Sequence, residues 1–170
     1  MMIVRRGLLA VSLCAALFAQ PFAAAAMSPQ EGAIRAAIIM QLPRYVAWKE
    51  IKKPTLCLMK NDSLNRSIKA LNAKRETYKE ILTLSMDQAL SQCDVIYIDD
   101  KREARRLITS TADAYALIIS NYSSFVDEGG TIGLINSSGS VGVEINLSNA
   151  MERGITLSPD LIEISRRVIQ

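Results

Sequence analysis

Short apolar runs alternate with helix-favouring segments through the middle of this 170-residue sequence, and the alternation restricts the folds open to the chain. Four runs, at 55–59, 80–84, 95–98 and 116–119, have the length and composition of strands. Because they are mainly apolar, without a regular alternation of polar residues, they suit a sheet that is covered on both faces. The order predicts an α/β fold with a largely parallel sheet and right-handed crossovers.

The segments between these runs carry helix-start signals. The capping residues are Asp62 or Ser63, Ser85 with Gln88, and Asp99 or Asp100. The helices that they open are expected to end near Leu71, Ser91 and Thr111, in that order. A further brief helix is predicted from Ser123 or Ser124, with Gly129-Gly130 as its stop.

The C-terminal part has a different pattern. Residues 131–135 and 141–147 flank a turn-like segment, and the second run alternates apolar and polar side chains. This predicts a half-exposed antiparallel hairpin at one edge of a sheet of five to six strands. A helical turn should cover residues 148–153, and a final helix should run from Ser158-Pro159 through Arg167.

An unusually apolar helix is predicted to begin at Ser28, which caps it, with Pro29 in the first turn. Its apolar residues recur at helical spacing as far as Trp48, and Pro43 must kink or split it. A helix that is apolar on most sides is either buried in the core or docked on a partner. Tyr45 and Trp48 are amphipathic residues of the kind that interfaces use, although Trp48 also fits the core.

Residues 1–26 have the organisation of a secretory signal peptide, with Arg5 and Arg6 before an apolar run and small residues before a cut near Ala26. The alternative is a membrane anchor, but the run is shorter than the ~20 residues of a bilayer span. Residues 27–170 are then expected to form one domain. Lys and Arg fall from 20 to 18 against 17 Asp and Glu, so the exported net charge is about +1 and gives no reason to bind nucleic acid.

The chain has no histidine, which excludes Ser-His-Asp and Cys-His relays and histidine-containing metal sites. In an exported chain, Cys57 and Cys93 indicate a disulfide, and the alternative is two buried thiols. The bridge would close a loop of about 37 residues and contribute roughly 3–4 kcal/mol.

Three candidate sites each have a simpler structural interpretation. Asp94, Asp99 and Asp100 could surround Mg²⁺, but helix capping accounts for the acids at 99 and 100. Gly129-Gly130 resembles a phosphate loop, but it precedes a strand and so fits a turn with positive φ. The helix face formed by Arg102, Arg105 and Arg106 could bind an acidic partner or simply face solvent.

Six segments taken together resemble the YfiR family of small periplasmic proteins, in order and spacing, over nearly all of residues 33–165. They are the Ala36-Ala37-Ile38 to Tyr45-Val46-Ala47-Trp48 helix, Leu56-Cys57-Leu58, Cys93 to Ile98, Glu128 to Ile132, Val143-Glu144-Ile145-Asn146, and Gly154 to Ser158 with Leu161. The sequence departs from the family pattern in three ways. It lacks the proline usual after Trp48, it has no cysteine after Cys93 for a second disulfide, and Asp99 or Asp100 stands where the family commonly has serine.

The resemblance implies a periplasmic negative regulator that binds the periplasmic sensor domain of an inner-membrane diguanylate cyclase and lowers cyclic-di-GMP output and biofilm formation. It also implies an outer-membrane lipoprotein that can sequester the regulator, a tendency to form homodimers, and a family disulfide at Cys57 and Cys93. Gly129, Gly130, Glu144 and Asn146 belong to its structural motifs.

We therefore expect a binding protein without catalysis, cofactor or metal. The expected contact residues are the first helix with Arg44, Tyr45 and Trp48, and the helix face of Arg102, Arg105 and Arg106. A periplasmic sensor with a small ligand at the carboxyl ends of the strands is one alternative. A histidine-free hydrolase that uses Asp99 or Asp100 is the other.

Overall fold

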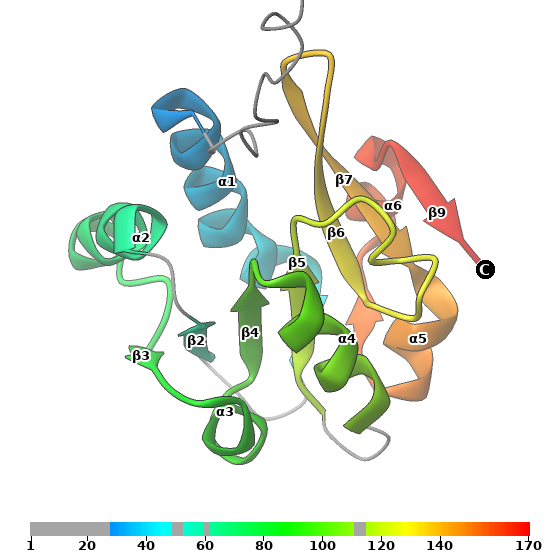
Figure 1. The fold of residues 1–170 in the computed structure, drawn as a ribbon, viewed down its shortest axis with the longest axis horizontal. Helices are drawn as coiled ribbons and strands as arrows, with labels where there is room; N and C mark the ends of the chain where they lie inside the picture. Colours follow the sequence, from blue (N-terminus) through cyan, green and yellow to red (C-terminus); the bar gives the residue numbers. More distant parts are fainter. Residues whose placement is uncertain (1–27, 49–52, 60–61, 111–114) are drawn as a thin grey trace, which may run out of the picture.

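A computed structural model describes residues 28–48, 53–59, 62–110 and 115–170, so the predicted signal peptide lies outside the described residues (Figure 1). The helices are α1 (Pro29–Gln41), the 3₁₀ helix η1 (Leu42–Tyr45), α2 (Asp62–Arg75), α3 (Met86–Gln92), α4 (Lys101–Ser110), α5 (Leu147–Glu152) and α6 (Pro159–Ile164). The strands are β1 (Val46–Ala47), β2 (Thr55–Met59), β3 (Glu80–Thr83), β4 (Val95–Ile98), β5 (Leu117–Ser120), β6 (Ile132–Ser137), β7 (Ser140–Asn146), β8 (Thr156–Leu157) and β9 (Arg167–Ile169).

Seven strands form one sheet in the order β3-β2-β4-β5-β6-β7-β9. All neighbours are parallel except β6 and β7, which form an antiparallel hairpin. A second, two-stranded sheet pairs β1 with β8. The predicted α/β fold with a largely parallel sheet is confirmed.

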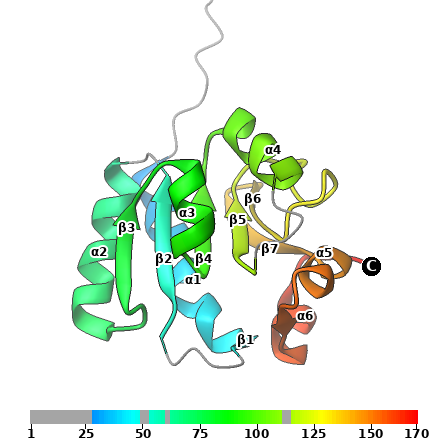
Figure 2. The ribbon, with the colours of Figure 1, turned by 90° about the horizontal axis from the view of Figure 1, so that it is seen from below.

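The sheet separates two hydrophobic cores. Within β2, Leu56 and Leu58 contribute to the core beneath α1 and α2, whereas Cys57 and Met59 contribute to the core beneath α3 and α4. Strand β4 and residues 117–119 of β5 alternate in the same way, which explains why these stretches are apolar at every position. Figure 2 shows α4 on one side of the strands and α6 on the other.

The sheet edge differs from the prediction. The final helix ends at Ile164 rather than at Arg167, and the last residues form β9, which pairs in parallel with β7. The hairpin is therefore one strand inside the edge, and the sheet has seven strands instead of five to six. The amide of Arg166 donates to the Val143 carbonyl, and the Arg167 side chain binds Glu144, so pairing with β7 wins over helix continuation.

The first helix is split at the predicted proline. Helix α1 ends at Gln41, and Pro43 lies in the first turn of η1. The chain then leaves the helical path, because Val46 pairs with Leu157 in the small sheet. Ser28 caps α1 as predicted, accepting a hydrogen bond from the Glu31 amide at 3.1 Å.

The connection from β5 to β6 is a series of turns over residues 123–129, not the brief helix that we predicted. Within this segment, the Glu128 amide donates to the Ser124 carbonyl, which is an α-helical spacing. The Gly130 amide instead reaches back five residues to the Phe125 carbonyl. Gly129 has a φ of +95°, as its turn role requires. A Cβ atom on Gly130 would overlap the buried Phe125 ring.

The β6–β7 hairpin extends past its neighbour β5 (Figure 1). Strand β5 pairs with β6 at only two positions, Ile119 with Ile132 and Ser120 with Gly133. The next carbonyl along β6, that of Leu134, accepts hydrogen bonds from the buried Arg35 of α1 at 3.3 Å. Glu31 holds Arg35 in place through an ion pair of 2.5 Å.

Candidate functional site

An apolar groove runs along the outer side of α1, between that helix and α6, with β7 as its floor. Its volume is about 360 Å³. Its lining consists of Ile34, Ala37, Ile38, Gln41, Leu42, Tyr45, Val143, Leu161 and Ile164.

The groove arises because α1 carries apolar side chains on more than the one face that packs against the sheet. One side of α1 is buried against the sheet through Ala36, Ile39 and Met40. The other side carries Ile34 and Ile38, which are only half-buried. One face of this helix therefore packs in the core, and its opposite face leaves apolar side chains half-buried at the surface.

Arg44 and Tyr45 lie at the end of this groove. Tyr45 is part of its lining. Arg44 is exposed, and its guanidinium donates to Gln41 Oε1 at 3.1 Å. Trp48 is half-buried against the core, and its indole Nε1 donates to the Pro43 carbonyl at 3.0 Å. Of the three expected contact residues of this segment, Tyr45 lines the groove and Arg44 lies beside it, whereas Trp48 stabilises the exit from η1.

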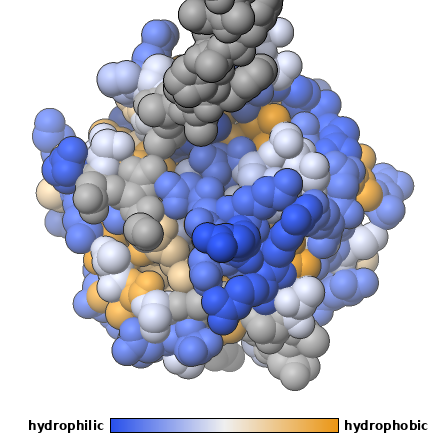
Figure 3. Space-filling model, in the orientation of Figure 1, coloured by the Kyte–Doolittle hydropathy of each residue, from blue (hydrophilic) through white to orange (hydrophobic). Residues whose placement is uncertain are grey.

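The basic face of α4 is largely occupied by contacts within the chain. Arg105 forms two hydrogen bonds of 2.6 Å with the Glu128 carboxylate, and Arg106 pairs with Glu103 at 3.1 Å. Lys101 lies over the Tyr122 ring, with 5.2 Å from its amine to the ring centroid. Figure 3 shows the strongly hydrophilic patch that these residues form over α4 and the neighbouring turns. Arg102 is exposed on the same helix.

Charged hydrogen bonds join the hydrophilic patch on α4 to the turn after β5. Hydrogen bonds from Arg105, and then from Tyr122, lower the pKa of Glu128 to about 2. Burial of the phenol, followed by its bond to Glu128, raises the pKa of Tyr122 to about 12. Both groups therefore keep their charge state across the physiological range.

The two expected contact surfaces do not come together. Tyr45 packs against the core under α1, and α4 covers the other core, so Arg44 and the face of Arg102, Arg105 and Arg106 lie on opposite sides of the sheet. A single small partner surface cannot touch both.

The predicted disulfide between Cys57 and Cys93 is formed. It joins the middle of β2 to the C-terminal cap of α3, with 5.8 Å between the Cα atoms. Both cysteines are buried in the core beneath α3 and α4. This bond crosses no part of the groove.

Glu144 and Asn146 have structural roles at the C-terminal end of β7. Asn146 caps α5 by accepting from the Asn149 amide, and its Nδ2 donates to the Val126 carbonyl. Glu144 pairs with Arg167 at 2.7 Å, and the same guanidinium pairs with Asp127 at 2.7 Å. Hydrogen bonds from Arg167 hold the pKa of Asp127 below its usual value.

Two of the acidic residues near β4, Asp94 and Asp100, accept hydrogen bonds from backbone amides. Asp100 Oδ1 accepts from the amides of Arg102 and Glu103, each at 2.9 Å, at the start of α4. Asp94 Oδ2 accepts from the Thr55 amide at 2.7 Å. Across residues 28–48, 53–59, 62–110 and 115–170, no cluster of three or more acidic or cysteine side chains could hold a metal ion.

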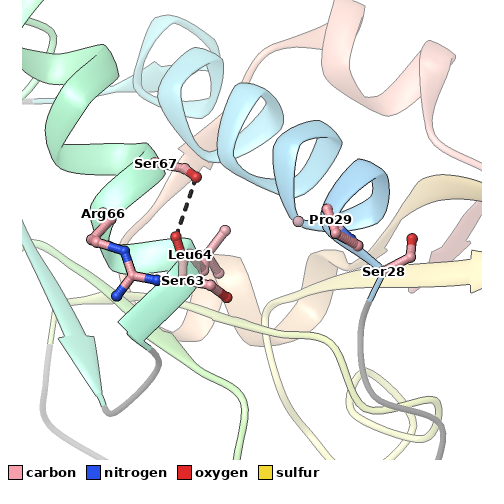
Figure 4. A pocket seen from close by; sticks show the side chains of 7 residues that line it. Ser28, Pro29, Ser63, Leu64, Arg66 and Ser67 are labelled. Atoms are coloured by element: carbon pink, nitrogen blue, oxygen red, sulfur yellow. Dashed lines mark hydrogen bonds between the residues drawn. The ribbon is translucent and has the colours of Figure 1, made fainter.

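A second pocket, also of about 360 Å³, lies between the first turns of α1 and α2 (Figure 4). Its lining consists of Ser28, Pro29, Gly32, Ser63, Leu64, Arg66 and Ser67. Because α2 follows β2 directly, this pocket lies beside the carboxyl end of that strand. Ser67 donates to the Ser63 carbonyl at 3.2 Å, as the dashed line in Figure 4 shows.

Sequence reasoning missed much of the lining of both pockets. Val143, Leu161 and Ile164 reach the groove from segments more than 95 residues after α1. Val143 and Leu161 belong to the family motifs, but no local pattern places them beside α1. Arg66 has the sequence features of an ordinary exposed helix residue. Only the structure shows that the apolar Ile164 is 66% exposed. In the part of the chain that the structure describes, no helix is long and apolar enough to cross a membrane.

A family model described as YfiR/HmsC-like matches residues 32–166. The chain belongs to the YfiR/HmsC-like family. The match covers every strand of the seven-stranded sheet except β9, and it confirms the resemblance drawn from the sequence motifs. Among the motif residues, Cys57 and Cys93 form the disulfide, Gly129-Gly130 form the turn before β6, and Glu144 pairs with Arg167, which lies just beyond the matched residues.

Two solved structures resemble this YfiR/HmsC-like chain. One is a conserved domain protein from Vibrio cholerae O1 biovar El Tor, with 14% identity and a TM-score of 0.61. The other is the ABC domain in complex with L-Trp from Streptococcus pneumoniae, with 15% identity and a TM-score of 0.55. Each alignment covers 81% of this chain but only 60% of the other chain, so the likeness shows the fold alone. No curated protein matches the chain.

Proposed function

We propose that this chain is an exported periplasmic regulator that binds the periplasmic sensor domain of an inner-membrane diguanylate cyclase and represses cyclic-di-GMP synthesis. The family match over residues 32–166 carries the proposal. The buried Cys57–Cys93 disulfide supports an oxidising compartment, since such bonds persist outside the cytosol.

The groove along α1 supports action by protein contact. It combines an aliphatic lining with Tyr45 and the neighbouring Arg44, and aromatic residues and arginine are enriched in protein interfaces. Of the two acids that a hydrolase could use, Asp100 accepts two backbone hydrogen bonds at the start of α4, which favours a capping role over a catalytic one. An outer-membrane lipoprotein that sequesters the regulator, and a homodimeric regulator, complete the proposal.

Deletion of the gene tests the proposal directly. Intracellular cyclic-di-GMP and biofilm mass should both rise, and expression of the full chain should restore them. A chain without residues 1–26 should fail to restore them, because it would not reach the cyclase domain. Unchanged cyclic-di-GMP in the deletion strain would contradict the repressor role.

The pocket between α1 and α2 favours one further function, a small-ligand sensor. In open α/β sheets, ligands bind outside the carboxyl ends of the strands, and this pocket lies beside the end of β2. A thermal-shift screen of amino acids, nucleotides and organic acids tests it, since a ligand that binds the folded state raises the melting temperature. Arg66→Gln should abolish any such shift, whereas Arg75→Gln at the far end of α2 should not.

A further inference from the structure

The lining of the groove has the dimensions of a helix contact. The residues that α1 and η1 contribute recur at helical spacing from Ile34 to Tyr45. Eleven steps of about 1.5 Å make a strip of about 16 Å, or three helical turns. Ala37, small and exposed, lies within this strip, so a second rod-like element can approach α1 closely there.

The floor of the groove disfavours an extended peptide. Strand β7 already pairs with β6 on one side and with β9 on the other, so its backbone offers no free ladder to an added strand. Of the lining side chains, only those of Gln41 and Tyr45 carry polar atoms. An extended chain would lose water from its amides without replacement, at a cost of about 1–3 kcal/mol for each buried group. A helix satisfies its own backbone and avoids that cost.

One exposed cation lies beside the groove. The Arg44 guanidinium donates to Gln41, which is one of the lining residues. Among the described residues, the Arg44 side chain forms no ion pair within the chain. An occupant with a carboxylate toward Arg44 would be favoured in one orientation.

From these observations we infer that the groove binds an amphipathic helix of the cyclase's periplasmic sensor domain, with a carboxylate of that helix against Arg44. The inference rests on the proposed function and adds the kind of element that docks, the site and the orientation. Apolar side chains at positions i, i+3 or i+4 and i+7 of the partner helix would fill the strip from Ile34 to Tyr45.

Substitutions in the full-length chain test the site. Ala37→Trp fills the groove from an exposed position, so the fold should survive, and cyclic-di-GMP should rise to the level of the deletion strain. Ala73→Trp, an exposed alanine on α2, is the matched control and should repress normally. Circular dichroism and melting temperature confirm that both variants are folded. Full repression by a folded Ala37→Trp variant would overturn the inference.

Charge variants test the orientation. Arg44→Glu should lose most of the repression, and Arg44→Lys should keep most of it, since lysine preserves the charge. Equal repression by the wild type and Arg44→Glu would show that no carboxylate of the partner helix binds at Arg44.

Photo-crosslinking from a benzoyl-phenylalanine at position 37 identifies the occupant in living cells. The expected product joins the chain to a cyclase periplasmic domain, and charge substitutions across the crosslinked segment should impair repression every three to four residues. A period of two would indicate a strand, and a crosslink to a second copy of this chain would indicate a dimer interface. Either result would overturn the inference.

The outcomes separate the two proposals. If deletion leaves cyclic-di-GMP unchanged, the proposed function fails, and with it the identity of the partner. If deletion raises cyclic-di-GMP but the Ala37→Trp variant still represses, the repressor role stands and only the groove inference fails.

Discussion

Two adjacent glycines at the start of β6 meet different physical requirements. Gly129 adopts a φ of +95°, which few other residues tolerate. Gly130 has no such dihedral, but its α-hydrogens face the Phe125 ring, which is completely buried. The pair therefore closes the turn after β5 by a backbone rotation at one residue and a close approach at the next.

Gly130→Ala should destabilise the fold by about 1–3 kcal/mol, because the new methyl group must displace a packed aromatic ring. Urea unfolding of purified protein measures the loss. In a Phe125→Leu background the same substitution should cost less, by on the order of 1 kcal/mol, since the smaller side chain leaves room. An equal cost in both backgrounds would show that the ring is not the obstacle.

Glu128 should make the free energy of unfolding depend on pH in the acidic range. Its pKa is lowered from 4.5 to about 2 in the folded state, so its contribution is present above pH 4.5 and is lost as the pH falls toward 2. Urea midpoints between pH 5 and pH 2 should therefore fall more steeply for the wild type than for Glu128→Gln. Parallel curves for the two proteins would contradict this assignment. Thr109→Ser is a conservative control that leaves the carboxylate in place.

At the scale of elements, the last strand depends on a side chain from its own first residue. Arg167 pairs with Glu144 on β7 and with Asp127 in the turn before β6, so β9 is tied to two neighbours. Its other attachments are the pairing with β7 on one side only and the packing of Val168 and Ile169 against the two cores.

Arg167→Met should loosen β9 while the rest of the sheet stays protected. The expected loss of global stability is on the order of 1 kcal/mol, because the ion pairs are partly exposed. Hydrogen exchange of the β9 amides should accelerate, whereas the amides of β4 should not change. Arg75→Met, at the end of α2, is the control and should leave both unchanged. Unaltered exchange in β9 would mean that backbone pairing alone holds the strand.

The sequence predicts elements well where the local pattern and the tertiary environment agree. Strands β2 and β4 have the predicted bounds, because every position faces one of two cores. The prediction fails at β9, where Ser158-Pro159 does open a helix but the pattern that follows does not mark its end. The residues that end it, Glu144 and the β7 backbone, lie about 20 positions upstream.

The candidate site could be predicted only in part, for the same reason. The apolar excess of α1, with Arg44 and Tyr45, is readable from sequence alone. The second wall and the floor come from α6 and β7, and only the fold brings them beside α1. Arg102, Arg105 and Arg106 read as a basic face, but the acids that neutralise part of it include Glu128, a turn residue 23 positions from Arg105.

At the scale of the whole molecule, the disulfide should govern resistance to unfolding. It links β2 to the end of α3 across one core, with a sequence separation of 36 residues. Reduction should lower the free energy of unfolding by about 3–4 kcal/mol, mainly by releasing the unfolded chain. Urea curves with and without dithiothreitol measure this. A Cys57→Ala/Cys93→Ala variant should show no response to the reductant, and an equal response would point to another cause.

The short overlap of β5 with β6 has a consequence for aggregation in the cell. A strand that outruns its neighbour presents backbone groups that invite pairing with another chain and so begin aggregation. Here the carbonyl at that point, on Leu134, is already occupied by the guanidinium of Arg35, and Glu31 keeps the arginine in place. Helix α1 thus prevents the unpaired part of β6 from pairing with a strand of another chain, while the opposite face of α1 stays free for a partner.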